Sequence, residues 1–157
     1  MEKRYCLRRR RSNKHNTTPD FDAILRAFAQ TNVYQNGDTL MPEVDCKLEA
    51  VGRIRRPDIA CFTAEQKART RFTSEIPVPH FVIEVISTHD HGTALEEKLD
   101  NYFRSGVQVV WYVYANLEIV RVYTSLDYGL HHAHDDLCTA APVAPEFSMT
   151  VNQIFAR

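Results

Sequence analysis

One hydrophobic segment stands out in the chain, FVIEVIS at positions 81–87, and a single carboxylate lies at its centre. A nearly continuous apolar run of this length is typical of a central strand that is covered on both faces. Alternation along the strand places Glu84 on the same face as Val82 and Ile86, within an apolar layer. Burying an unpartnered carboxylate costs several kcal/mol, so we expect a metal ion, a cation or hydrogen-bond donors beside Glu84.

Before this segment, the pattern predicts a helix followed by a hairpin. The sequence TTPD at 17–20 is typical of a helix start with a threonine cap, and apolar residues then recur at helical spacing up to Phe28. Residues 40–49 and 53–62 read as two strands joined at Val51-Gly52, and Pro57 predicts an edge, a bulge or a bend in the second. Residues 63–72 indicate a short helix or an irregular connection.

After the segment, the pattern predicts a loop at 88–92 and a helix that Thr93 and Glu96 begin as a capping box. This helix carries an apolar stripe and ends at Gly106, and the strand 107–114 follows it. A strand–helix–strand unit of this length joins parallel strands by a right-handed crossover. Residues 118–123 then read as an antiparallel neighbour. The pattern weakens from residue 125, with a terminal helix expected at 151–155. The predicted fold class is α/β, a mixed β-sheet flanked by helices.

The composition fits one globular domain, since the 157 residues are 44% hydrophobic and 25% charged. No apolar run approaches the roughly 20 residues that cross a bilayer, and the N-terminus lacks the apolar segment of a signal peptide. We therefore expect a cytoplasmic protein that does not enter a membrane. The cysteines show neither a zinc-site spacing nor a disulfide framework, so we expect reduced thiols. They are Cys6, Cys46, Cys61 and Cys138.

Charge is distributed unevenly along the chain. Residues 1–14 hold seven of the 19 basic residues and one of the 20 acidic residues, which leaves a formal charge of −7 on the remainder. We expect residues 1–18 to form a flexible basic arm and residues 19–157 to form a single domain. The arm can be interpreted either as a nucleic-acid contact or as a disordered tail. The acidic body counts against a simple nucleic-acid binder.

Three residues suggest a chemical site. Asp58 follows a proline at the start of an apolar run, Glu84 lies in the central strand, and Lys98 lies on the following helix. At about 100° per residue, Lys98 lies about 40° from Tyr102, at the rim of the apolar stripe. Two carboxylates and a lysine are the groups that metal-assisted phosphodiester cleavage needs, because carboxylate oxygens bind Mg²⁺ and a lysine orients water or stabilises developing charge.

The same positions carry a family resemblance. The chain is similar to the bacterial Uma-type restriction endonuclease family, within the PD-(D/E)XK nuclease superfamily, over roughly residues 20–155. The resemblance lies in Arg56-Pro57-Asp58, Glu84-Val85-Ile86-Ser87, Glu97-Lys98-Leu99, Tyr102, Gly106-Val107 and Trp111.

The resemblance implies a restriction-endonuclease-like sheet, with Asp58 and Glu84 as ligands of Mg²⁺, or of Mn²⁺, and Lys98 as the catalytic lysine. Ile86 stands where the superfamily motif has its lysine, so the amine would come from the helix. The family's usual longer N-terminal region, often with a helical acid, is not evident. Glu43, which follows a proline on the preceding strand, is a candidate for a further metal ligand.

Several alternatives stay open. Asp58 and Glu84 also fit a structural pair whose charges neighbouring cations satisfy. Lys98 also fits a solvated lysine on the helix surface, and Glu43 also fits an ordinary strand carboxylate. His89 and His91 could approach a metal or a phosphate, although loop histidines usually have no such role. The histidine-rich segment 131–136 matches no firm zinc spacing and favours a solvent-facing hairpin over a metal cluster.

The leading hypothesis is a Mg²⁺-dependent, or Mn²⁺-dependent, endonuclease that hydrolyses DNA phosphodiester bonds. Three arginines near Asp58 could position the nucleic-acid backbone: Arg53, Arg55 and Arg56. A homodimer is expected, because duplex cleavage needs two cuts and symmetric dimers are the commonest assemblies. The alternative is a catalytically inactive nuclease-fold protein that binds nucleic acid or a protein partner.

Overall fold

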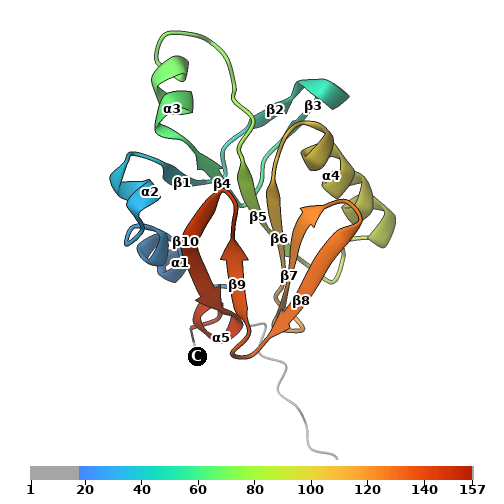
Figure 1. The fold of residues 1–157 in the computed structure, drawn as a ribbon. Coiled ribbons are helices and arrows are strands. Elements are labelled where there is room, and N and C mark those ends of the chain that lie inside the picture. The colour runs from blue at the N-terminus through green and yellow to red at the C-terminus, as the bar shows by residue number, and fades with distance from the viewer. Residues whose placement is uncertain (1–17, 157) are drawn as a thin grey trace, which may run out of the picture.

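A six-stranded mixed sheet forms the centre of the protein in the computed structural model, which describes residues 18–156 (Figure 1). The strand order is β1-β4-β5-β6-β7-β8, and β5 and β6 form its parallel pair. The strands are β1 (Thr39–Pro42), β4 (Ile59–Phe62), β5 (Phe81–Ile86), β6 (Val109–Tyr114), β7 (Ile119–Ser125) and β8 (Tyr128–Ala133). The sheet and its flanking helices confirm the predicted α/β class.

Helix α4 (Gly92–Arg104) makes the connection that the sequence predicted between the parallel strands β5 and β6. The helix ends where expected, because Gly106 adopts a φ of 99° that other residues rarely take. The N–H of Gly106 then donates to Phe103 O at 3.1 Å, and that of Val107 donates to Tyr102 O at 3.1 Å. These two bonds satisfy carbonyls of the last helical turn and fix the register of Tyr102 against the sheet.

Each face of the sheet has its own hydrophobic core. Phe81, Ile83 and Trp111 face a layer made by α1 (Phe21–Phe28), α5 (Val151–Ile154) and the hairpin of β9 (Leu137–Ala140) with β10 (Ala144–Thr150). Val82 and Ile86 face the opposite way, toward α4 and the pair β2 (Cys46–Leu48) and β3 (Arg53–Arg55). The predicted alternation along β5 is confirmed, and Glu84 belongs to the α4 face.

The predicted hairpin of residues 40–49 and 53–62 is split into two parts. β1 pairs with β4 inside the main sheet, whereas β2 and β3 form a separate two-stranded sheet. The break lies at Glu43, whose φ is 50°, and at the buried Pro57, which cannot donate a ladder hydrogen bond. The turn between β2 and β3 contains the short helix η1 (Glu49–Val51) and Gly52. The predicted bend near Pro57 is therefore confirmed.

Two predicted helix starts are wrong. The cap of α1 is Asp20, whose side chain accepts from Ala23 N at 2.9 Å, so Pro19 precedes the cap. Aspartate is a strong cap residue, and it displaces the threonine cap that the sequence suggested. Helix α4 begins at Gly92 after His91, which makes no side-chain cap. Thr93 lies inside the helix, so it does not form the predicted capping box with Glu96.

The remaining elements lie in segments where the pattern of hydrophobic positions is weak or fits two interpretations. Residues 63–72 contain α3 (Ala64–Thr70), which begins with a capping box between Thr63 and Gln66. The short α2 (Asn32–Gln35) and the strands β8, β9 and β10 were not predicted, whereas α5 confirms the predicted terminal helix. Cys46, Cys61 and Cys138 are buried free thiols, while Cys6 and residues 1–17 of the predicted arm lie outside the described residues. Within residues 18–156, no helix is long and apolar enough to cross a membrane.

Candidate functional site

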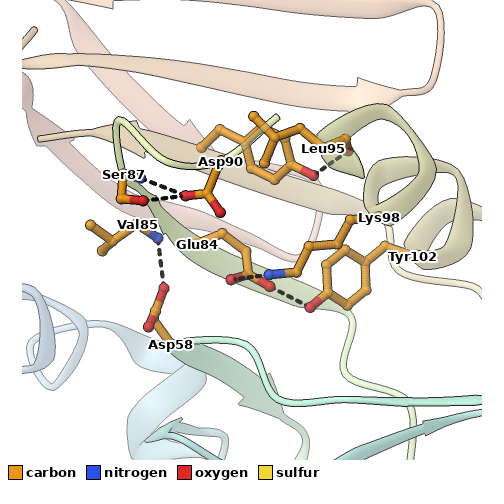
Figure 2. A network of polar contacts seen from close by, with 9 residues as sticks. Asp58, Glu84, Val85, Ser87, Asp90, Leu95, Lys98 and Tyr102 are labelled. Atoms are coloured by element: carbon orange, nitrogen blue, oxygen red, sulfur yellow. Dashed lines mark hydrogen bonds and ion pairs between the residues drawn. The ribbon is translucent and has the colours of Figure 1, made fainter. Parts of the chain in front are cut away.

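Glu84 has the two partners that its burial requires. The side chain of Tyr102 donates from Oη to Glu84 Oε1 at 2.5 Å, and Lys98 Nζ lies 2.7 Å from Glu84 Oε2 (Figure 2). Glu84 is 3% exposed and Tyr102 is completely buried, while the Lys98 side chain keeps 25% of its surface exposed. The expectation of a compensating group beside this carboxylate is confirmed, and both groups come from α4.

The spacing along α4 explains this pairing. Lys98 and Tyr102 are four residues apart, so they lie one above the other on the same side of the helix. The neighbouring Tyr112 of β6 lies beside Glu84 in the parallel register and donates from its hydroxyl to Leu95 O at 2.8 Å. These contacts hold α4 against the sheet at the level of Glu84.

Asp58 lies next to Glu84 across the antiparallel pair β4–β5. It occupies the bend just before β4, where the pairing of Ile59 with Ile83, continued by one residue, brings Asp58 opposite Glu84. Its Oδ2 accepts from the backbone N–H of Val85 at 2.7 Å, which fixes the carboxylate beside β5 (Figure 2). The two carboxylates and the Lys98 amine are therefore brought together, as the sequence analysis expected.

The electrostatic setting of Glu84 is unusual for a carboxylate. Burial raises the pKa of Glu84 above its ordinary value of 4.5, and the negative charge of Asp58 raises it further. Lys98 and the Tyr102 hydroxyl oppose this shift because they stabilise the ionised form. Burial also raises the pKa of Tyr102, with a further contribution from Glu84, so that its hydroxyl remains a proton donor near neutral pH.

The carboxylates offer the type of ligands that a hard divalent cation prefers. Mg²⁺ is usually held by one or two carboxylates together with water and substrate phosphate oxygens, and an ionised carboxylate can accept at about four positions. Asp58 and Glu84 fit such a two-carboxylate set, with the Lys98 and Tyr102 contacts using one position on each Glu84 oxygen. Within residues 18–156, no group of three or more His, Cys, Asp or Glu side chains is arranged to hold a metal.

Glu43 is connected to Asp58 through its backbone. Its N–H donates to Asp58 O at 3.1 Å, while its side chain is exposed. Its positive φ marks the end of β1, where the chain leaves the main sheet. The role of the Glu43 carboxylate as a further metal ligand therefore stays a prediction.

The three arginines that were expected to position nucleic acid are each paired with an acid of the same chain. Arg56 makes a two-point contact with Asp45, at 2.8 and 3.1 Å. Arg53 and Arg55 of β3 both approach Glu97 of α4, at 2.9 and 3.9 Å. These contacts link β2, β3 and α4 around the site, and they neutralise part of the charge that a phosphate would meet.

The candidate histidines lie at the surface. His89 and His91 are exposed in the loop after β5, where Asp90 accepts from both the N–H and the hydroxyl of Ser87. In the segment 131–136, His131 and His134 are exposed and His132 is half-buried on the edge strand β8 and the following turn. The interpretation of this segment as a solvent-facing hairpin is consistent with that exposure.

The Tyr102 hydroxyl was not predicted as a partner of Glu84. Tyr102 counts as an apolar residue in the helical stripe, and the stripe does not show where the tyrosine hydroxyl points. The available signal was the spacing of four residues from Lys98, which puts both polar ends on the same side of α4.

Comparisons with known proteins identify the family and the fold. A family model described as "Putative restriction endonuclease", Uma2, matches residues 11–152. A solved structure from Anabaena variabilis, described as a "putative nuclease belonging to DUF820", has a TM-score of 0.70 and 19% sequence identity, over 86% of this chain and 79% of that one. At this identity the likeness shows a common fold. No curated protein matches the chain.

Proposed function

Because the chain belongs to the Uma2 family, described as "Putative restriction endonuclease", we propose that it is a metal-dependent endonuclease that hydrolyses DNA phosphodiester bonds. The observation that carries the proposal is the grouping of Asp58, Glu84 and Lys98 at one point of the central sheet. A buried carboxylate with a raised pKa, beside a second carboxylate and a lysine, is a typical functional arrangement.

In this proposal, Asp58 and Glu84 hold Mg²⁺, for which Mn²⁺ can substitute, and Glu43 is a candidate for a further ligand. The ion, when bound, lowers the pKa of a water molecule and offsets negative charge on the phosphate. The Val85 N–H keeps the Asp58 carboxylate oriented, and Tyr102 keeps that of Glu84 oriented.

Lys98 has the role of the catalytic lysine. Its ammonium group holds protons at Nζ, next to Glu84 and at the partly exposed end of the network. From there it can donate a hydrogen bond to an attacking water or to a phosphate oxygen and stabilise the developing charge. In this view the amine comes from α4 because Ile86, two residues after Glu84, is buried in the core beneath that helix.

The proposal is tested by calorimetric titration with Mn²⁺ and by cleavage of plasmid DNA in Mg²⁺. Asp58→Asn and Glu84→Gln should remove most of the Mn²⁺ binding and the cleavage while the proteins stay folded. Lys98→Met should abolish cleavage and keep Mn²⁺ binding. Glu96→Gln, which removes an exposed carboxylate from the same helix, is the matched control and should behave like the wild type.

A second function remains a candidate because both Glu84 oxygens already have partners within the chain. A nuclease-fold protein without activity, binding nucleic acid or a protein partner, would use Lys98 and Tyr102 only to satisfy a buried acid. For such a protein, calorimetric titration would show no heat of Mn²⁺ binding that Asp58→Asn removes. The substitutions at Asp58, Glu84 and Lys98 would then change only the free energy of unfolding. Under the first function we also propose a homodimer, which sedimentation of the intact chain would detect as twice the monomer mass.

A further inference from the structure

A row of polar residues extends from Glu84 across the sheet toward its edge strand. The register pairs Glu84 with Tyr112, Tyr112 with Arg121, and Arg121 with His131. Residues paired directly across neighbouring strands lie on the same face of a sheet, so Arg121 shares the face of Glu84 and α4. Neighbouring strands lie about 4.8 Å apart, which puts the Arg121 backbone about 10 Å from that of Glu84.

The guanidinium of Arg121 differs from those of most other arginines in the described part of the chain. It lies over the ring of Tyr114, 5.0 Å from its centroid, and its buried Nε has no hydrogen-bond partner. The Arg121 charge also opposes the rise that burial causes in the pKa of Tyr114, so the guanidinium already interacts with that hydroxyl. By contrast, six arginines within residues 18–156 pair with carboxylates: Arg26, Arg53, Arg55, Arg56, Arg69 and Arg104.

The surroundings of Arg121 are aromatic. Tyr114 follows Tyr112 on the same face of β6, and the rings of Tyr112 and Tyr123 meet edge to face at 5.5 Å. A guanidinium stacked on an aromatic ring is partly oriented in advance, so less side-chain freedom is lost when it binds an anion. Arginine presents paired N–H donors that match the oxygens of a phosphate.

We infer that Arg121, supported by Tyr114, contacts a backbone phosphate of the nucleic acid bound at Asp58 and Glu84. This inference rests on the proposed function, and it assigns the direction in which the substrate crosses the sheet, toward β7 and β8. A strand separation of about 10 Å lets Arg121 reach a phosphate close to the one held at the carboxylates. By contrast, Arg53, Arg55 and Arg56 could contact a phosphate only after their ion pairs with acids of the same chain had broken.

The test measures binding of a short fluorescein-labelled DNA duplex, without divalent ions, over a series of salt concentrations. Each phosphate contact that is lost reduces the slope of log affinity against log salt by about one. Arg121→Gln should therefore have a slope lower by about one, and Arg121→Lys, which keeps the charge, should keep the slope. Arg71→Gln is the charge-matched control, since Arg71 is an exposed arginine beyond the end of α3.

The outcomes separate this inference from the function on which it rests. Thermal melting and Mn²⁺ titration of Arg121→Gln should match the wild type and show that the fold and the carboxylate site are intact. If the wild type binds and cleaves DNA but Arg121→Gln has the same slope as Arg71→Gln, the inference is wrong and the nuclease function stands. If Arg121→Gln unfolds, Arg121→Met takes its place, because it removes the charge and keeps an apolar stem beside Tyr114: a slope lower by about one supports the contact, and a slope equal to that of Arg71→Gln contradicts it. A wild type that neither binds nor cleaves DNA overturns both.

Discussion

Removing the Tyr102 hydroxyl tests whether Glu84 is held as an ionised, buried carboxylate. Tyr102→Phe keeps the ring in the core and deletes the donor that lies 2.5 Å from Glu84 Oε1. A hydrogen bond to a charged group contributes about 1.5–3 kcal/mol, so we expect the free energy of unfolding to fall by about 2 kcal/mol. For a domain of this size, this corresponds to a decrease in Tm of about 4–8 °C.

Tyr112→Phe is the matched control. Tyr112 is almost as buried as Tyr102 and faces the same helix, but its hydroxyl donates to an uncharged group, the carbonyl of Leu95, at 2.8 Å. A bond between neutral groups contributes about 1 kcal/mol, so this substitution should lower Tm by about 2–4 °C. The difference between the two substitutions measures the contribution of the charge on Glu84.

The pH dependence makes the comparison decisive. The Tyr102 bond favours the ionised form of Glu84, so its loss should cost most at a pH above the raised pKa of the folded protein's Glu84. Below the ordinary glutamate pKa of 4.5, Glu84 is protonated in both folded and unfolded chains, and Tyr102→Phe should then resemble Tyr112→Phe. Urea unfolding below pH 4.5, and again above the raised pKa of Glu84, measures how much free energy of unfolding each variant loses in the two conditions. Equal costs for the two variants at high pH, or a Tyr102→Phe cost that does not change with pH, would show that Glu84 is not held as an ionised carboxylate.

Three further predictions concern the same framework. Because the folded-state pKa of Glu84 is raised, wild-type stability should fall as pH rises from 4.5 through that higher pKa, so the stability of Glu84→Gln relative to the wild type in urea should increase over this window. Gly106→Ala should lower the free energy of unfolding by about 1 kcal/mol or more, because φ is 99° there, whereas Gly92→Ala, at a helical position with open space, should not destabilise. Asp20→Ala should cost about 1 kcal/mol in thermal melting through the loss of the α1 cap.

The sequence predicted the central strands because their signals are local. β5 and β6 are buried on both faces, so their apolar runs indicate strands without knowledge of their neighbours. The buried position of Glu84 follows from the same run. The candidate site was proposed because Asp58 follows Pro57 at the start of an apolar run, Lys98 lies on the helix after the central strand, and the family resemblance covers both positions.

The C-terminal strands depend on contacts that a local pattern does not contain. β8 is largely exposed, so its residues show little alternation, and it is defined by its pairing with β7. β10 contains a register shift opposite β9, which interrupts its period of two. The arginine pairs are also non-local, since Arg53 and Glu97 lie on different elements and are 44 residues apart. A charge near Asp58 in the sequence therefore did not indicate a charge that is free to bind phosphate.

Under the proposed function, the position of the lysine has a physical reason. Ile86 lies on the same face of β5 as Glu84, and it is buried in the core under α4. A lysine at that position would have to carry its charge into this core or bend out of it, at considerable desolvation cost. Lys98 reaches the same carboxylate from above, with its apolar stem along the helix and its ammonium partly exposed. Lys98 thus places an amine beside the Glu84 carboxylate although no lysine follows Glu84 on β5. Cleavage of DNA by Lys98→Met would count directly against the proposed catalytic role.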